Sequence, residues 1–382
     1  MLIRDALIYG EDLRPQKGDL AVREGKIAAI GEHLDPKAWG EVLDARGARL
    51  TPGLIDIHVH GGLGYAVSDA DAASLDAISR LLGSQGVTSF CPATSAAAPE
   101  ALEASFRAVG AYMGRERGAY IHGVHMEGPF IAAAQRGAQD PRHMRWPSAE
   151  EARRLRRMAP ISILGMAPEL PGALDLAREM APGSCVAFAH SAATYEEARA
   201  GLEAGFRHAV RLFCDMPAFH HRAPGLVGAV LDDPRATAEL VCDGVHLHQS
   251  VVRMAFRLLG EDRAVAVSDA AAAAGLPEGA YRIHGAEFYR SGGAVFADQG
   301  RTLVGGSAPL YEGLRNLLSW GVDERAALRA VTVNPARVIG VHEKTGSVAV
   351  GKAADLLLAD ENWNLRAVMI RGILQDGLQP GS

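Results

Sequence analysis

Residues 52–61 read Pro-Gly-Leu-Ile-Asp-Ile-His-Val-His-Gly, an apolar run that ends in two histidines. Side chains alternate between the faces of a strand, so His58 and His60 are predicted to point to the same side. Two imidazoles on one face, followed by glycines that allow a sharp turn, can bind one cation. For this pair alone, two solvent-exposed loop histidines are an equally good interpretation. The remaining sequence favours the cation site, because it supplies further ligand-type residues at the ends of later strands.

The composition limits the class of protein. The chain has 382 residues, 48% of them hydrophobic, which is enough for a large core. Its length suits an eight-fold α/β barrel with a small additional domain. A net charge of −6 argues against a nucleic-acid partner, which would need a basic surface. The four scattered cysteines, the early charges and the lack of a long apolar stretch predict a reduced, cytoplasmic protein without a membrane partner.

Apolar strands alternate with amphipathic helical segments over residues 51–335, which is typical of βα units around a parallel sheet. Residues 1–50 contain short strands with a predicted hairpin turn at Glu24-Gly25, and residues 336–382 return to strands. We therefore predict an α/β fold, a (β/α)8 TIM-like barrel that interrupts a small β-sandwich domain formed by both chain ends. The strands expected in the barrel span residues 54–58, 87–92, 119–127, 161–167, 186–190, 207–213, 239–243 and 264–269, and those expected after it span 346–348, 355–359 and 368–372.

The active site of such a barrel lies at the C-terminal ends of its strands. A single buried histidine or glutamate there is more often structural, but a whole set of metal ligands and acid–base groups favours catalysis. Asp269 ends the last barrel strand, where an aspartate beside a metal-bound water can take its proton and pass it to a leaving amine. We therefore predict Asp269 as the catalytic residue. Read in chain order, the strand ends carry His58, His60, Glu127, His190, Arg211, His246 and Asp269.

Several longer strings make the pattern more specific. They are HMEGPF at 125–130, AHSAATY at 189–195, HRAPG at 221–225, DGVH at 243–246 and GKAADL at 351–356. In this order, and over nearly the whole chain, they resemble the N-acetylglucosamine-6-phosphate deacetylase family of the amidohydrolase superfamily. The resemblance implies a barrel with a split β-domain, usually in a homodimer. It also implies hydrolysis of the N-acetyl group of an amino-sugar 6-phosphate.

The resemblance assigns roles to residues of this chain. Asp269 matches the family's catalytic acid/base, and Glu127 and His190 match its metal ligands. His58 and His60 match a pair that some members use for a second metal and others have replaced.

On the substrate side, Arg222 and His246 match positions that contact the sugar phosphate. A guanidinium fork suits the oxygens of a phosphate, and an imidazole adds a second donor. Gln139 stands where the family has a substrate-contacting histidine, and Cys214 and Asp215 stand where it has asparagine and alanine. We expect all five residues to belong to the substrate-binding pocket.

Arg211 is the main departure from the family pattern, because the family has a metal-binding histidine at this position. A guanidinium stays protonated and has no lone pair for a cation, so Arg211 joins the expected pocket residues instead. We expect Asp215 to pair with Arg211 and hold it away from the metal. We also expect His208, three residues earlier on the same predicted strand, to lie on the opposite face.

The expected cofactor is one divalent metal per chain. Imidazole and carboxylate ligands favour zinc, and they also suit iron, cobalt or manganese. We expect the metal to bridge the His58/His60 pair and the Glu127/His190 side. The fixed charge of Arg211 disfavours a second divalent cation by repulsion.

Three functions remain open from the sequence. The favoured one is a metal-dependent deacetylase that acts on an amino-sugar 6-phosphate. The second is an amidohydrolase that acts on a different N-acyl or cyclic amide, and the third is a catalytically impaired paralogue that binds sugar phosphates. The retained base and metal ligands count against the third function, and the phosphate pair favours the first over the second. Arg211 and Gln139 keep the second open.

Overall fold

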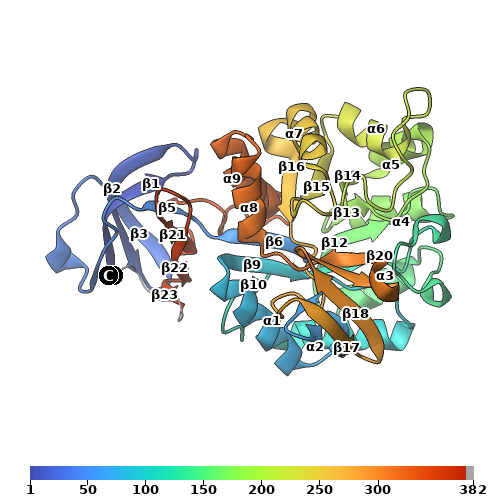
Figure 1. Ribbon diagram of the computed structural model, residues 1–382, viewed down its shortest axis with the longest axis horizontal. Helices are drawn as coiled ribbons and strands as arrows, with labels where there is room; N and C mark the ends of the chain where they lie inside the picture. The colour runs from blue at the N-terminus through green and yellow to red at the C-terminus, as the bar shows by residue number, and fades with distance from the viewer. Residues whose placement is uncertain (376–382) are drawn as a thin grey trace.

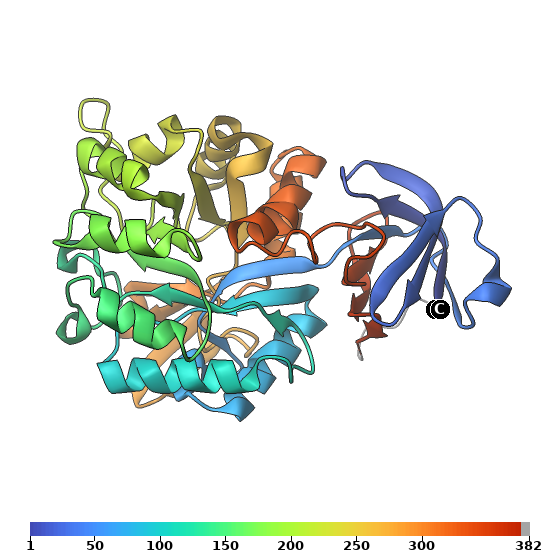
Figure 2. The ribbon, with the colours of Figure 1, turned by 180° about the vertical axis from the view of Figure 1, so that it is seen from behind.

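The computed structural model describes residues 1–375 and shows a barrel with a smaller sheet domain beside it (Figures 1 and 2). The parallel strands pair in chain order, and the bridges Ala93–His125 and Val59–Ala270 join the remaining edges, so the barrel is closed. This confirms the predicted (β/α)8 fold class. The third strand is in two pieces, β10 and β11. The barrel strands are β6 (Leu54–Val59), β9 (Val87–Pro92), β10 (Tyr120–Ile121), β11 (Val124–Glu127), β12 (Ile161–Met166), β13 (Cys185–Phe188), β14 (Phe206–Ala209), β15 (Thr237–Val241) and β16 (Ala264–Val267).

Helices surround the barrel and turn their apolar faces toward it. The first helix, α1, buries Leu75, Ile78 and Leu82 in the main core. The helix α5 begins with the predicted capping box of Thr194 and Glu197. Within residues 1–375, no helix combines the length and the hydropathy needed to cross a bilayer. The helices are α1 (Ala72–Ser84), α2 (Pro99–Tyr112), α3 (Ala149–Arg156), α4 (Ala173–Met180), α5 (Tyr195–Ala204), α6 (Gly225–Asp232), α7 (Gln249–Arg263), α8 (Leu310–Ser319), α9 (Glu324–Val331) and α10 (Val333–Val338).

Strands from both chain ends form one connected sheet beside the barrel, blue and dark red at the left of Figure 1. Its order is β23-β22-β21-β5-β1-β2-β3, with β4 paired to β1, and β21 runs antiparallel to β5. The predicted hairpin at Glu24-Gly25 joins β2 to β3. The strand predicted at 346–348 was wrong, because these residues form a loop in which Val348 packs into the sheet domain's core without pairing. The strands are β1 (Leu2–Tyr9), β2 (Pro15–Arg23), β3 (Lys26–Gly31), β4 (Val42–Asp44), β5 (Arg49–Pro52), β21 (Leu356–Ala359), β22 (Leu365–Ile370) and β23 (Ile373–Leu374).

An antiparallel sheet that the sequence analysis did not predict follows β16, orange in Figure 1. A bridge between Ala270 and Gly306 attaches it to the barrel. Its first two strands expose most of their side chains, so they lack the apolar pattern that marks the barrel strands. The sheet contains β17 (Gly279–Ile283), β18 (Ala286–Ser291), β19 (Ala294–Ala297) and β20 (Thr302–Gly306), and a smaller ribbon pairs β7 (Gly61–Gly62) with β8 (Tyr65–Ala66).

Candidate active site

The C-terminal ends of the barrel strands bring four predicted residues into one buried cluster. Nε2 of His58, on β6, lies 3.1 Å from Nε2 of His60, so the two rings share a side as predicted. Glu127, the last residue of β11, places Oε1 3.5 Å from Nε2 of His58 and Oε2 3.2 Å from Nε2 of His60. Asp269, just beyond β16, brings Oδ1 to 3.4 Å from Nε2 of His58. The histidine pair, the carboxylate and the predicted base therefore meet at one point.

Glu239 supports this cluster from inside the barrel, and the sequence analysis missed it. It is fully buried on β15, with Oε2 2.8 Å from Nδ1 of His58 and Oε1 3.2 Å from Nε2 of His208. Nδ1–H of His58 is assigned as the donor to Glu239, which leaves the lone pair of Nε2 facing the cluster. Burial raises the pKa of Glu239, but His58 and His208 outweigh burial and hold that pKa below its usual range. The available signal was a glutamate between Ala238 and Leu240 in an apolar strand, because a buried carboxylate needs a partner.

The position of His208 corrects one expectation. Strand alternation placed it on the face opposite Arg211, but its ring lies inside the barrel, between Glu239 and Oγ1 of Thr237 at 2.6 Å. The reason is that β14 ends at Ala209, and Arg211 already has a φ of 45°, which is outside the strand region. Alternation therefore cannot be counted from His208 to Arg211.

Asp269 is held in one orientation, with its two oxygens in different surroundings. Oδ2 accepts a hydrogen bond from Nη1 of Arg211 at 3.1 Å and lies 3.3 Å from Nε2 of His246. Oδ1 is buried without a hydrogen-bond donor among the described residues, and it faces His58. Burial raises the pKa of Asp269, but the charge of Arg211 and the close contact with His246 lower that pKa below its usual range. The carboxyl is therefore ionised with one free oxygen, as a general base must be.

His246 lies behind this base, whereas the resemblance implied a phosphate contact. Its ring is buried, with Nδ1 2.6 Å from Oδ2 of Asp243 and Nε2 facing Asp269. Burial lowers the pKa of His246, but the two aspartates outweigh burial and raise that pKa to about 9. The ring is therefore an imidazolium that helps to hold the carboxylate of Asp269 in place, because both of its nitrogens face carboxylates.

Arg211 lies inside the cluster. Its Nη2 is 2.9 Å from Oδ2 of Asp215, so the predicted pair forms. The expectation that Asp215 holds the guanidinium away from the metal ligands was wrong, because the same Nη2 is 3.2 Å from Oε1 of Glu127. Burial opposes the charge, but Asp269, Glu127 and Asp215 outweigh burial and raise the pKa of Arg211 well above its usual value. The turn after β14 sets this position, since Arg211 and Asp215 both have positive φ.

His190 and Gln139 are the remaining polar residues that contact this cluster. His190 follows β13, and its Nδ1–H is assigned as the donor to the carbonyl oxygen of Gln135 at 2.8 Å. Its Nε2 then accepts from Nη2 of Arg211 at 2.9 Å and from Nε2 of Gln139 at 3.1 Å. Gln139 is fixed in turn, because its Oε1 accepts from the backbone N–H of Ala96 at 2.6 Å.

A cavity of about 390 Å³ opens onto this cluster. Its opposite wall is largely apolar and comes from residues 93–97, residues 271–273 and the β17–β20 sheet. Besides His246, two other residues expected in the pocket lie elsewhere in the described structure. Arg222 is exposed on the loop before α6, and Cys214 packs against the main core, where burial raises the pKa of its thiol to about 12. The predicted site residues that line the cavity are His60, Glu127, Gln139, His190, Arg211 and Asp215.

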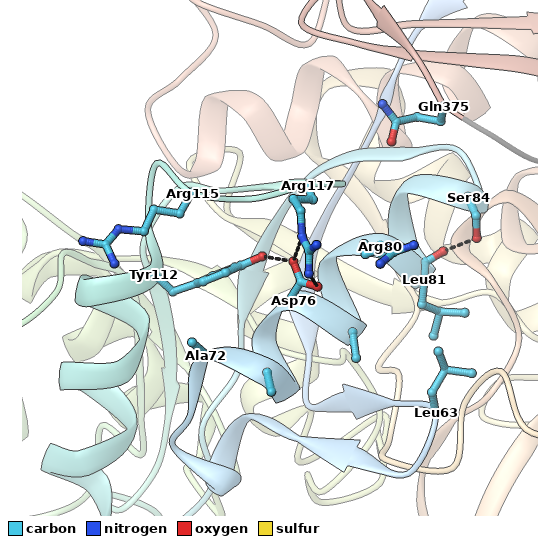
Figure 3. A pocket seen from close by; sticks show the side chains of 12 residues that line it. Leu63, Ala72, Asp76, Arg80, Leu81, Ser84, Tyr112, Arg115, Arg117 and Gln375 are labelled. Atoms are coloured by element: carbon cyan, nitrogen blue, oxygen red, sulfur yellow. Dashed lines mark hydrogen bonds and ion pairs between the residues drawn. The ribbon is translucent and has the colours of Figure 1, made fainter.

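A larger groove, of about 1000 Å³, lies beside α1 (Figure 3). None of the residues that line it belongs to the cluster around His58, His60 and Glu127. Asp76 is its only acidic lining residue within the described chain, and it pairs with Arg117 and accepts a hydrogen bond from the hydroxyl of Tyr112 at 2.8 Å. Because Asp76 is already paired with Arg117 and Tyr112, this groove offers no free acidic group for catalysis. The smaller cavity at the strand ends is therefore the candidate active site.

The donor atoms of His58, His60 and Glu127 fit a divalent metal ion. The two Nε2 atoms lie 3.1 Å apart, Nε2 of His58 lies 3.5 Å from Oε1 of Glu127, and Nε2 of His60 lies 3.2 Å from Oε2. A tetrahedral site with bonds of about 2.1 Å has ligand atoms about 3.4 Å apart, so these spacings suit one metal ion. Nδ1 of His58 faces Glu239, so Nε2 is the ring atom available to a cation, and Oε1 of Glu127 is buried without a hydrogen-bond donor among the described residues. Acceptor atoms crowded in this way are costly unless a cation joins them.

Comparisons with known proteins agree with this geometry. The profile of the Amidohydrolase family matches residues 49–374. The chain is 33% identical over 359 residues to an N-acetylglucosamine-6-phosphate deacetylase of Vibrio furnissii, covering 92% of this chain and 88% of that protein. It is 32% identical over 360 residues to an N-acetylgalactosamine-6-phosphate deacetylase of Escherichia coli O157:H7, covering 93% and 94% of the two chains. The solved structure of N-acetylglucosamine-6-phosphate deacetylase from Pasteurella multocida superposes with a TM-score of 0.92 at 27% identity, over 98% of this chain and 99% of that one. The chain therefore belongs to the amidohydrolase family, in the group of N-acetylglucosamine-6-phosphate deacetylases.

Proposed function

We propose that this protein is a metal-dependent deacetylase that hydrolyses the N-acetyl group of an amino-sugar 6-phosphate. One observation carries the proposal: the free oxygen of ionised Asp269 faces the donor atoms of His58 and His60. This arrangement provides a base beside a cation site, which amide hydrolysis needs and simple binding does not. The relatives support the substrate class, since they are named deacetylases of the 6-phosphates of N-acetylglucosamine or N-acetylgalactosamine.

Each residue of the cluster has a separate role in the proposed reaction. His58, His60 and Glu127 would hold a divalent cation, which supplies Lewis acidity and makes a water more acidic. Glu239 keeps His58 in the tautomer that offers Nε2 to the cation. Asp269 accepts a proton at Oδ1 and donates it to the leaving amine, while two cationic side chains hold its other oxygen in place.

Further parts of the proposal rest on the donor set and on the resemblance. Two imidazoles and one carboxylate favour zinc as the metal. Arg222 stays the proposed phosphate contact, since its exposed guanidinium is free of any hydrogen bond or ion pair to the other described residues. The homodimer and the cytoplasmic location stay predictions.

The test is acetate release by the purified protein from the 6-phosphates of N-acetylglucosamine and N-acetylgalactosamine, and from the same sugars without phosphate. We expect turnover of at least one 6-phosphate, lost on treatment with a chelator and restored by Zn²⁺. Turnover of other N-acyl or cyclic amides alone would overturn the substrate class and favour the second function. Binding of the 6-phosphates with no amide turnover by metal-loaded protein would favour the impaired paralogue.

A further inference from the structure

The guanidinium of Arg211 lies among groups that ordinarily surround a metal ion. Its Nη2 is 2.9 Å from Oδ2 of Asp215, 3.2 Å from Oε1 of Glu127 and 2.9 Å from Nε2 of His190. Its Nη1 is 3.1 Å from Oδ2 of Asp269. Three carboxylates and one imidazole lone pair thus converge on a single organic cation.

The gap that Arg211 fills has the dimensions of a metal site. Nε2 of His190 and Oε1 of Glu127 are 3.3 Å apart, close to the separation of about 3.4 Å expected for two ligands of one tetrahedral ion. Nη2 of Arg211 contacts both atoms, so a cation between them would overlap the guanidinium. We propose that Arg211 permanently replaces a second metal ion. One exchangeable divalent cation then lies on the His58/His60 side of Glu127, and His190 does not bind it.

The contacts of His190 support this division. Its Nδ1–H is committed to the carbonyl of Gln135, and its Nε2 lone pair receives N–H groups from both Arg211 and Gln139. No lone pair of the ring is left for a metal. On the other side of Glu127, the Nε2 atoms of His58 and His60 face each other at 3.1 Å. The His190 side of Glu127 is therefore occupied by the guanidinium of Arg211, and the His58/His60 side is the one open to a metal ion.

Asp215 explains how a permanent cation is kept in place. The guanidinium side chain is 11% exposed and cannot lose its proton, so it needs nearby negative charge. Asp215 supplies a carboxylate that contacts Arg211 and is more exposed than Glu127 or Asp269. Arg211 and Asp215 act as one unit that neutralises the His190 side without a metal.

This inference rests on the proposed metal-dependent function, but its test reads metal content and not turnover, so each can fail without the other. Purified proteins are stripped with a chelator, reloaded with Zn²⁺, desalted and measured by elemental analysis. We expect one zinc per parent chain and two per Arg211→His chain. Arg107→His, which adds a histidine to an exposed position on α2, is the matched control and should stay at one.

Two ligand variants make the assignment independent of how well Arg211→His folds. In the parent, His58→Gln should reduce the zinc content by at least tenfold, whereas His190→Gln should leave one zinc and an unchanged visible spectrum of the Co²⁺-loaded protein. In the Arg211→His background, His190→Gln should remove one of the two ions. Two tightly bound ions in the parent, or loss of the parent's zinc in His190→Gln, would overturn the proposal.

Discussion

Glu239→Gln tests whether a carboxylate away from the reacting atoms controls the metal site. Glu239 faces three donors: Nδ1 of His58 at 2.8 Å, Nε2 of His208 at 3.2 Å and the backbone N–H of Arg211 at 3.2 Å. Glutamine has the same shape but only one acceptor oxygen, so its NH₂ group must face one of these donors. If it faces His58, the ring changes tautomer and turns an N–H toward the cluster. Loss of such a partner typically lowers metal affinity about 10- to 100-fold, which is about 1.4–2.7 kcal/mol.

The assay is a Zn²⁺ titration in competition with a chromogenic chelator. Asp355→Asn is the matched control, because Asp355 is a buried carboxylate of the sheet domain that accepts from Oγ1 of Thr345 at 2.8 Å. We expect unchanged zinc affinity for the control and a loss near the upper end of the range for Glu239→Gln. Thermal unfolding of both metal-free variants separates lost binding from lost folding. A folded Glu239→Gln protein with an affinity within twofold of the parent would refute the tautomer argument.

Three other predictions concern the base, the phosphate and the pH dependence of stability. Asp269→Asn should keep its metal and its fold but lose about 10²–10⁴-fold in kcat; a turnover number within threefold of the parent would mean that another group is the base. Arg222→Ala should raise KM for a 6-phosphate about 10- to 150-fold, since a charge-assisted contact is worth about 1.5–3 kcal/mol, and equal losses on unphosphorylated substrate would remove Arg222 from phosphate binding. His246 has its pKa raised to about 9 in the folded chain, so its contribution to stability is complete below its unfolded pKa of about 6.5 and is lost as pH rises through about 9. Urea unfolding of the metal-free parent should therefore show a loss of up to about 3 kcal/mol between pH 6 and pH 10 relative to His246→Gln. Parallel pH profiles for the two proteins would contradict the ion pairs of His246 with Asp243 and Asp269.

The sequence predicted the barrel and the centre of its site because both follow from local patterns and one topological rule. Apolar strands alternate with amphipathic helices, and a parallel barrel collects all of its C-terminal strand ends at one rim. His58, Glu127 and Asp269 each lie at or just beyond the C-terminal end of a strand, so their meeting required no knowledge of packing. The antiparallel sheet that covers the pocket was missed because its exposed strands lack a buried face to set a pattern.

The parts that could not be predicted depend on three-dimensional contacts. Arg211 has a φ of 45° although it is not glycine, so nothing local indicated that β14 ends before it. Glu239 was visible as a charge in an apolar strand, but the sequence could not show that its partner is His58, far away in the chain. His246 ends the recognisable string at 243–246, yet only the packing shows that its ring faces Asp269 and not the cavity.

The sheet shared by both chain ends has a consequence for how the protein is made. β5 is synthesised before the barrel, and β21, which pairs with it, is synthesised only after the barrel. During that interval the nascent chain carries a sheet with an open edge, whose unpaired N–H and C=O groups can recruit strands from other chains. β21 covers this edge when it pairs with β5. A chain truncated before β21 would therefore contain the barrel but would leave the edge of β5 unpaired and prone to bind strands of other chains. Termination between β20 and β21 would have this effect, although all of the candidate site residues would already have been translated.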